Sequence, residues 1–195
     1  MDEHGCEGRT LHSVPGMVAA LEEARAGGAV VVGVDGRSGA GKTALAARLA
    51  SAIPHARVLH LDEVYRGWWG LARGLDHMVT FALAPLARGE AGRYRPWDWT
   101  DGRPTGWVDV PALQPGELLL VEGCGAIAAP IDAYIQLGVW CRAPEAVRRA
   151  RAMERDDWHW EEHWDRWARQ EDALDHRRPA DLCWEAGSGW EERIS

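Results

Sequence analysis

The sequence predicts an α/β fold, in which a parallel sheet of about five strands is flanked by helices. Short, continuous apolar runs rich in β-branched residues, such as residues 29–34 (AVVVGV), are typical of strands buried on both faces. These runs alternate with longer helical segments, and this alternation favours parallel pairing of the strands. The 195 residues are enough for a single domain over residues 1–195, with a short lid at about 151–162.

The alternation can be followed along the whole chain. Residues 15–26 have Pro15 in the first turn and end at Gly27, which are start and stop signals of a helix. The other predicted helices cover residues 43–52, 71–88, 144–155 and 160–174. The predicted strands cover residues 29–34, 57–62, 117–121, 134–141 and 181–184. Residues 89–115, rich in Gly, Pro and Trp, show little periodicity.

Charge and composition exclude several classes of protein. The net charge is -8, whereas a general nucleic-acid binder needs a basic surface, so we expect no nucleic-acid partner. No apolar run reaches the about 18 residues of a membrane span, and the acidic N-terminus lacks a secretory signal. The four cysteines are widely spaced, which favours reduced thiols. We therefore expect a cytoplasmic protein that does not contact a membrane.

Residues 36–43 carry the strongest motif. They read Gly36-Arg37-Ser38-Gly39-Ala40-Gly41-Lys42-Thr43, which fits the phosphate-binding pattern G-x-x-x-x-G-K-[ST]. The glycines allow successive backbone N–H groups to curl around phosphate oxygens, and the start of the next helix adds partial positive charge. We expect this loop, including Ser38 and Ala40, to bind ATP.

The end of the motif supplies side-chain chemistry. Lys42 is the only lysine among 22 basic residues, and it stands where an ammonium group would reach the β- and γ-phosphates. The Thr43 hydroxyl is expected to ligate Mg²⁺. Such a loop serves kinases, GTPases and ATPases alike, so the reaction depends on residues elsewhere.

Two carboxylates end predicted strands. Asp62 follows one of them, where a carboxylate can accept a proton from a hydroxyl or hold Mg²⁺ through water; a helix cap is the alternative. Glu122 ends another predicted strand and is expected to bind Mg²⁺ together with Thr43. The alternative is that Glu122 is an ordinary surface carboxylate.

Several segments together resemble one known family. The combination of GRSGAGKT (36–43), HLDEVY (60–65), PWDW (96–99) and VEG (121–123) is similar to the uridine kinase-like nucleoside kinases, of the compact actinobacterial type. The resemblance covers about residues 30–184 and implies a P-loop kinase fold. The loop is generic, whereas the Asp-x-x-Tyr segment and PWDW are more specific.

The resemblance also implies roles for individual residues. It makes Asp62 the base for a sugar hydroxyl and Tyr65 an aromatic residue of the substrate pocket. It makes Asp76 a ribose-binding carboxylate and places Trp97 and Trp99 near the base. The other implied substrate and phosphoryl-binding residues are Arg103, Gln170 and the lid arginines Arg151 and Arg155.

Physical reasoning supports some of these roles and leaves alternatives open. Arg148, Arg151 and Arg155 share one helix face, where guanidinium groups suit phosphate; a solvated basic face is the alternative. Trp97 and Trp99 would stack on a nucleobase, or pack together under a loop. The aromatic face at Trp160, Trp164 and Trp167 is typical of packing on the domain, with a lid or a homodimer face as alternatives.

The sequence therefore predicts a kinase that transfers the γ-phosphoryl group of MgATP to a hydroxyl of a small molecule, first of all a nucleoside. One alternative is a nucleoside monophosphate kinase, whose pocket would need arginines such as Arg66, Arg73 or Arg103. The other is a regulatory ATPase that works through a partner protein. A GTPase is disfavoured because no N-K-x-D segment is present.

Overall fold

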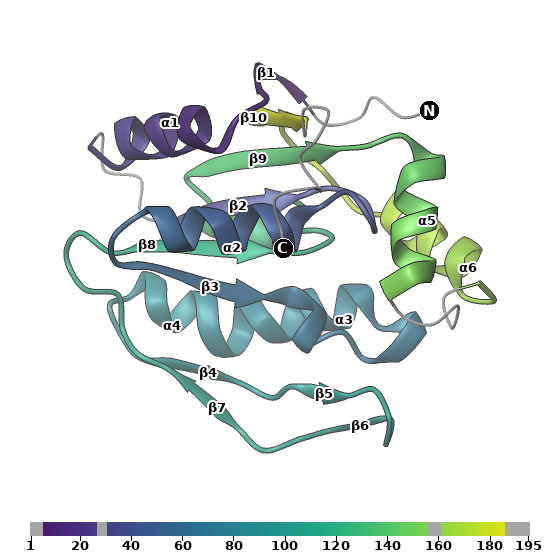
Figure 1. Cartoon of the computed structure of the whole chain (residues 1–195). Helices are drawn as coiled ribbons and strands as arrows, with labels where there is room; N and C mark the ends of the chain where they lie inside the picture. Colours follow the sequence, from purple (N-terminus) through teal and green to yellow (C-terminus); the bar gives the residue numbers. More distant parts are fainter. Residues whose placement is uncertain (1–5, 27–30, 156–160, 186–195) are drawn as a thin grey trace.

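A single parallel sheet organises the molecule (Figure 1). The structure is a computed structural model that describes residues 6–26, 31–155 and 161–185. Six strands pair in the order β1-β10-β9-β2-β8-β3. Their bounds are β1 Cys6–Leu11, β2 Val31–Asp35, β3 Ala56–His60, β8 Leu118–Glu122, β9 Leu137–Arg142 and β10 Ala180–Glu185. The predicted fold class is confirmed, because every pairing in this sheet is parallel.

Helices cover both faces of the sheet. The α1 helix (Val14–Ala26) and the α2 helix (Lys42–Ala52) pack on one face, against Val32 and Val34 of β2. The α3 helix (Leu71–Met78) and the α4 helix (Ala84–Ala87) belong to the other face. Figure 1 shows α5 (Glu145–Arg155) and α6 (Trp164–Asp172) together beyond one end of the sheet. The strand and helix alternation thus produces a three-layer arrangement.

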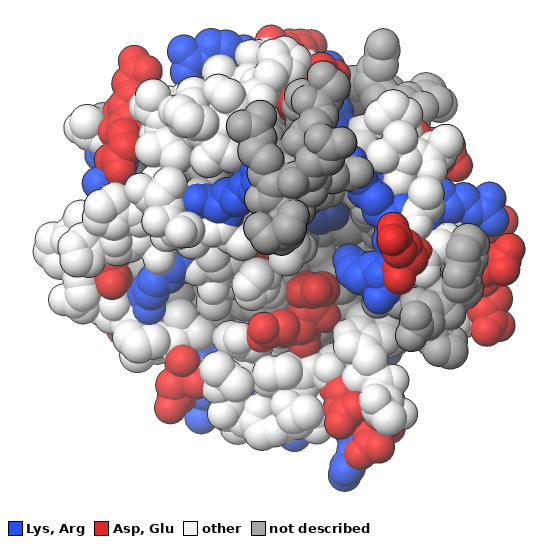
Figure 2. Space-filling view, in the orientation of Figure 1, with Lys and Arg blue, Asp and Glu red and all other residues white. Residues whose placement is uncertain are grey.

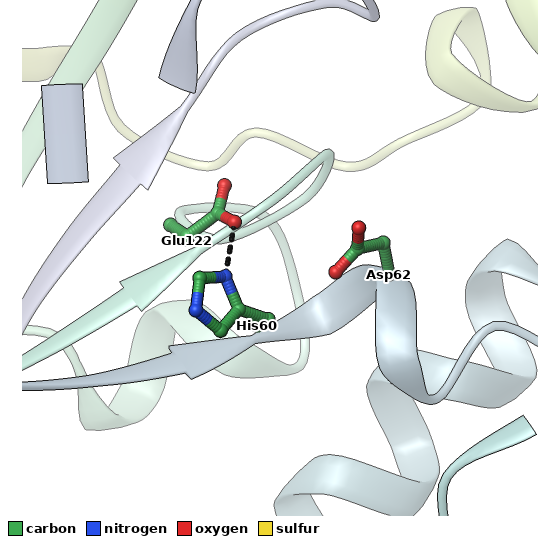
Figure 3. A group of neighbouring side chains, drawn as sticks. All are labelled: His60, Asp62 and Glu122. Carbon is green, nitrogen blue, oxygen red and sulfur yellow. Dashed lines mark hydrogen bonds and ion pairs between the residues drawn. The ribbon is translucent and has the colours of Figure 1, made fainter. Parts of the chain in front are cut away.

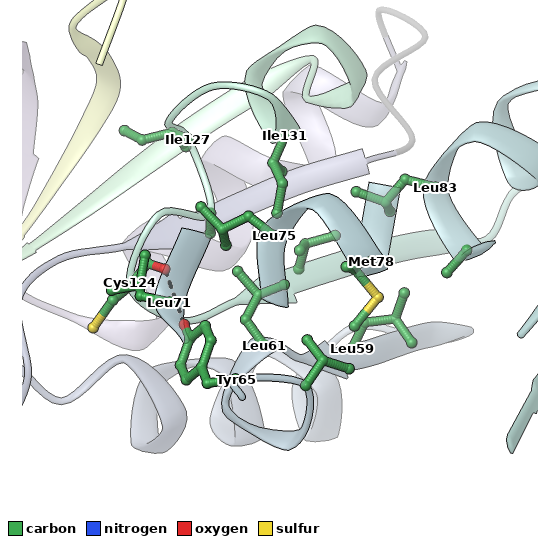
Figure 4. Packing of buried hydrophobic residues seen from close by; sticks show 14 of the residues in the cluster. Leu59, Leu61, Tyr65, Leu71, Leu75, Met78, Leu83, Cys124, Ile127 and Ile131 are labelled. Atoms are coloured by element: carbon green, nitrogen blue, oxygen red, sulfur yellow. Dashed lines mark hydrogen bonds between the residues drawn. The ribbon is translucent and has the colours of Figure 1, made fainter. Parts of the chain in front are cut away.

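Burial of apolar side chains packs α3 against the second face of the sheet. Leu59, Leu71, Leu75 and Met78 are buried in one cluster with Leu61, and Figure 4 shows these side chains interdigitating. Each fully buried side chain of this size contributes about 1.5–3 kcal/mol relative to the exposed state. This cluster fixes the 3-10 turn η1 (Leu61–Glu63) directly after β3, and so positions the segment that carries Asp62.

The structure corrects the predicted number of strands. The sixth strand, β1, was not predicted, because its sequence is half exposed and polar and lacks a continuous apolar run. It pairs only with β10, at the edge of the sheet.

Two other predicted segments are subdivided. The predicted helix 71–88 consists of α3, a π-helical segment η3 (Val79–Leu83) and α4, with Pro85 in the first turn of α4. The stretch after it holds two small antiparallel pairs. These are β4 (Gly92–Tyr94) with β7 (Val108–Val110), and β5 (Trp97–Asp98) with β6 (Arg103–Pro104). A short turn, η2 (Gly67–Trp69), precedes α3, and another, η4 (Ile131–Tyr134), precedes β9.

The expectation of four reduced thiols is wrong for two of the cysteines. Cys6 on β1 and Cys183 on β10 form a disulfide, with their Cα atoms 5.8 Å apart. The bond joins residues 177 positions apart and ties the edge strand to its neighbour. Cys124 and Cys141 are free and buried. Spacing along the chain did not reveal the pair, because only the pairing of β1 with β10 brings the two residues together. Among the described residues, no helix is long and apolar enough to cross a membrane.

A thiol titration tests the disulfide. Protein purified without reductant and then denatured should show two reactive thiols per chain, and reduction should raise that number to the four cysteines of the sequence. Replacing Cys6 and Cys183 with serine should lower the free energy of unfolding by about 2–4 kcal/mol, since the denatured chain loses a long-range restraint. Four reactive thiols before reduction would contradict the bond.

Candidate active site

The phosphate-binding motif forms a tight loop between β2 and α2. Gly39 and Gly41 adopt positive φ angles of 77° and 91°, which side-chain-bearing residues rarely adopt. A Cβ atom on Gly39 would lie 2.1 Å from the backbone oxygen of Arg148, so that position requires glycine. The α2 helix begins at Lys42 with no side-chain cap. Its first backbone N–H groups are therefore oriented to receive an anion.

Lys42 lies inside this loop. Its side chain is buried, and its Nζ atom donates to the backbone oxygen of Arg37 at 3.1 Å and lies 3.4 Å from Cys124 Sγ. Burial by itself would lower the pKa of Lys42, but the surrounding Cys124, Glu171 and Glu122 side chains outweigh it and raise the pKa. The group therefore remains a cation, as phosphate binding requires.

Asp35, the last residue of β2, anchors the start of the loop. Its buried carboxylate accepts hydrogen bonds from the backbone N–H groups of Gly36 at 2.6 Å, Gly125 at 2.8 Å and Ile127 at 2.9 Å. His176 Nε2 lies 3.3 Å from the same carboxylate; burial lowers the pKa of His176, but the bond to Asp35 raises it overall. Asp35 thus joins the loop to the segment after β8. We did not predict this role, although an acid ending an apolar strand just before the loop was a visible signal.

A second acid holds the loop from the opposite side. Glu171 on α6 accepts hydrogen bonds from the Ser38 backbone N–H at 2.7 Å and from Arg37 Nε at 3.1 Å. Cys124 Sγ lies 3.2 Å from the same carboxylate, and burial raises the pKa of this thiol to about 12. No local sequence pattern indicated this contact, since Glu171 is more than a hundred residues from the loop.

The ends of β8 and β3 bring Glu122 and His60 to the next part of the site (Figure 3). The strand register pairs Glu122 with Val34 on one side and with His60 on the other. His60 Nδ1 lies 2.6 Å from Glu122 Oε1, and Thr43 Oγ1, in the first turn of α2, donates to the same oxygen at 3.2 Å. The hydrogen bond to Glu122 raises the pKa of His60 against the opposing effect of burial.

Asp62 completes this group. Its carboxylate, the Glu122 carboxylate and a ring nitrogen of His60 offer ligand atoms that all lie within 4.8 Å of one another. Asp62 is exposed to solvent on one side, yet the protein atoms around its carboxyl group, together with the charge of Glu122, raise its pKa. Figure 2 shows acidic atoms in the middle of this face, over the carboxyl ends of β3 and β8, with basic atoms over α5 beside them.

The donor set fits a hard divalent cation. Mg²⁺ prefers oxygen ligands, and Thr43, Glu122 and Asp62 supply a hydroxyl and two carboxylates. His60 adds a nitrogen that holds the Glu122 carboxylate by a hydrogen bond.

The α5 helix brings arginines against the loop. Arg151 Nη1 donates to the Gly39 backbone oxygen at 3.3 Å, and Arg148 Nη1 donates to the Ser38 backbone oxygen at 3.3 Å. Arg148 is buried, whereas Arg155 is exposed and its charge acts on Asp62. Of the predicted lid, residues 151–155 belong to α5. Residues 156–160, which include Trp160, lie outside the described residues.

Two of the predicted substrate residues line a cavity between α3, η3 and β5. The cavity has a volume of about 570 Å³, and its lining includes Asp76 and Trp97 together with Arg66 and Arg73. Trp99 lies nearby, with its ring centroid 5.1 Å from that of Trp68.

The remaining predicted substrate residues lie outside the lining of this cavity. Gln170 bridges α6 to the turn before α3, because its Nε2 donates to the Trp68 backbone oxygen at 2.8 Å. Tyr65 is buried in the core, where its hydroxyl donates to the Cys124 backbone oxygen at 2.9 Å. Arg103 is exposed and pairs with Asp101 at 2.8 Å.

Solved structures share this fold. The chain is similar to a candidate fructose transport system kinase from Silicibacter sp. TM1040, with a TM-score of 0.59 and 22% identity over 90% of this chain and 100% of that one. It is also similar to a candidate uridine kinase from Bacillus stearothermophilus, with a TM-score of 0.62 and 16% identity over 88% and 97% of the two chains. No protein-family profile matches the chain, and no curated protein matches it. The molecule thus has the fold of P-loop kinases.

Proposed function

We propose that this chain is a small-molecule kinase that transfers the γ-phosphoryl group of MgATP to an alcohol. The observation that carries the proposal is the continuous set of contacts from the loop to Asp62. Thr43 contacts Glu122, Glu122 contacts His60, and the Asp62 carboxylate lies within 4.8 Å of ligand atoms of both Glu122 and His60. A phosphate cradle and a carboxylate base at the same end of the sheet are what in-line transfer to a hydroxyl requires.

In the proposed reaction, the acceptor oxygen forms a bond to the γ-phosphorus atom while the bond between that atom and the ADP oxygen breaks. The hydroxyl proton passes to the Asp62 carboxylate. The raised pKa of Asp62 makes it a stronger base than an ordinary aspartate. Loop N–H groups and Lys42 neutralise the triphosphate charge.

The metal and the lid have supporting roles. Thr43 and Glu122 would hold Mg²⁺, which neutralises charge on the phosphate oxygens when it is bound. Arg151 and Arg155 at the end of α5 would contact the transferring group, because guanidinium groups grip phosphate oxygens in bidentate fashion. Residues 151–162 would serve as a lid that excludes water during transfer.

The acceptor class follows from chemistry and resemblance. The motifs shared with uridine kinase-like proteins make a nucleoside the first acceptor to test, with Trp97 near its base and Asp76 near its sugar. The cavity supports an acceptor site there, because its lining includes Arg66, which follows Asp62 closely along the chain.

ADP release tests this function. Wild-type protein with MgATP should release ADP at least about ten times faster with one member of a panel of nucleosides, nucleotides and sugar alcohols than without any acceptor. Replacing Lys42 with methionine keeps the length of the side chain and removes its charge, and it should reduce turnover by about 10²- to 10³-fold.

The controls separate the rival functions. Replacing Arg48 with methionine removes a cation from the same helix outside the loop, and turnover should stay near the wild-type rate. Equal ADP release with and without every acceptor would overturn the kinase and favour a regulatory ATPase.

A further inference from the structure

The cavity between α3, η3 and β5 carries more positive charge than a neutral acceptor needs. Arg66 and Arg73 both line it, and Asp76 is the one acidic residue in its lining. Burial lowers the pKa of Arg66, and the nearby charge of Arg95 lowers it further. In the described part of the chain, none of these three arginines forms an ion pair within 4.0 Å.

The contacts of His77 show that donors outnumber acceptors here. Arg66 Nη2 lies 3.1 Å from His77 Nδ1, and the Arg95 backbone N–H donates to His77 Nε2 at 3.0 Å. Both partners are obligate donors, yet a neutral imidazole ring has only one nitrogen that accepts. In one of the two contacts, an N–H donor of the ring therefore faces another N–H donor, and no hydrogen bond can form there. Burial, Arg66 and Arg95 all lower the pKa of His77, so the ring stays neutral and adds no charge.

An anion in the cavity would resolve this imbalance. The guanidinium of Arg66 would turn from the histidine towards the anion, and His77 would keep its bond to the Arg95 backbone. Arg66 and Arg73 together would offer donors in fixed planar geometry, which matches the oxygens of a phosphate group. The rings of Trp97 and Phe81 supply apolar surface for the rest of the molecule.

Asp62 decides which part of the acceptor reacts. A base is needed when an alcohol attacks, because the hydroxyl must lose its proton. A phosphate dianion has no proton to lose, so a base would bring no advantage if phosphate were the attacking group. The anionic group is therefore an anchor, and the reacting group is a separate hydroxyl.

We propose that the acceptor is an alcohol that already carries a phosphate monoester, which Arg66 and Arg73 bind in this cavity. This inference rests on the proposed kinase function for its reaction, while its binding step can be tested separately. The hydroxyl oxygen would bond to the γ-phosphorus atom of ATP, ADP would leave, and the product would carry two monoesters.

Calorimetry tests the binding step without turnover. The protein is first saturated with Mg²⁺ and a non-hydrolysable ATP analogue, so that the loop is occupied, and matched ligands are then titrated. The pairs are ribose and ribose 5-phosphate, glycerol and glycerol 3-phosphate, and uridine and uridine 3′-monophosphate. Glycerate is titrated as well, to test whether the site prefers a carboxylate to a phosphate. At least one phosphate monoester should bind at least about ten times more tightly than its neutral parent.

Variants locate the binding site. Replacing Arg73 with glutamine should weaken the preferred monoester by about 10- to 100-fold, and Arg66→Gln should act in the same way. Arg88→Gln is the matched control, because Arg88 lies directly after α4, is exposed and pairs with Glu90. Equal binding of parents and monoesters, unchanged affinity in both variants, or tighter binding of glycerate than of the monoesters would overturn the proposal.

Turnover with the same panel separates this proposal from the kinase itself. The preferred monoester should stimulate ADP release, and ³¹P spectra should show a second monoester signal. A diphosphate signal on the acceptor, distinct from the α- and β-phosphorus signals of ADP, would overturn the inference, because the phosphate would then be the attacking group. Stimulation by neutral parents alone would overturn it while preserving the kinase. Arginine-dependent binding without stimulation by any acceptor would instead count against the kinase function.

Discussion

Replacing Asp62 with asparagine is expected to lower kcat by about 10²- to 10⁴-fold, the range over which a positioned general base acts. The amide has nearly the same shape as the carboxylate but cannot accept the proton of the attacking hydroxyl. ATP affinity should change less than threefold, because the loop from Gly36 to Thr43 is untouched. Single-turnover measurement of phosphoryl transfer at saturating ATP and acceptor checks this result.

The same substitution should leave the fold intact. The pKa of Asp62 is raised in the folded protein, so ionising it opposes folding at pH values above the pKa of the unfolded chain. Removing the charge at pH 8 should therefore keep or slightly raise the melting temperature. Loss of activity without loss of stability is the pattern expected of a group placed for chemistry.

A matched control sets the baseline for this comparison. Asp109 on β7 is an exposed carboxylate outside the site, and Asp109→Asn should keep activity near the wild-type value. If Asp62→Asn retained more than about a tenth of the wild-type kcat, Asp62 would not be the base.

The largest effect on stability is expected at Asp35. Replacing it with alanine leaves the buried N–H groups of Gly36, Gly125 and Ile127 without their acceptor. Each such group costs about 1–3 kcal/mol, so the free energy of unfolding should fall by at least about 3 kcal/mol. The loop should also lose ATP affinity, because Gly36 is its first residue. Urea unfolding and nucleotide titration measure the two effects.

Asparagine at the same position separates hydrogen bonding from packing. Its amide oxygen can still accept from Gly36 and Gly125, while its NH₂ group would face the Ile127 N–H. Asp35→Asn should therefore lose about 1–3 kcal/mol, less than Asp35→Ala. Asp175→Ala, which removes an exposed carboxylate paired with Arg177, should stay within about 0.5 kcal/mol of the wild type. Equal stability of Asp35→Ala and the wild type would contradict the anchoring role.

Much of the arrangement could be predicted from short stretches of sequence. The loop at 36–43 is contiguous, so its glycines and Lys42 indicate their geometry locally. The buried strands are indicated by unbroken apolar runs. Asp62 and Glu122 could be expected near one another, because the carboxyl ends of parallel strands meet at one edge of a sheet. In the main sheet only the edge strand β1 was missed, since an edge strand needs no continuous apolar run.

Other features depend on contacts between distant residues. Asp35 meets Gly125 and His176, Glu171 meets Ser38, and Cys6 meets Cys183, in each case across about 90 to 177 positions. Their residue types were visible, but strand order and register determine which of them touch. The sequence by itself determined the fold class and the phosphate loop, because periodicity and turn chemistry act over a few residues. Only the tertiary structure decided how the loop is anchored and which arginines line the cavity, because packing selects among many long-range pairings.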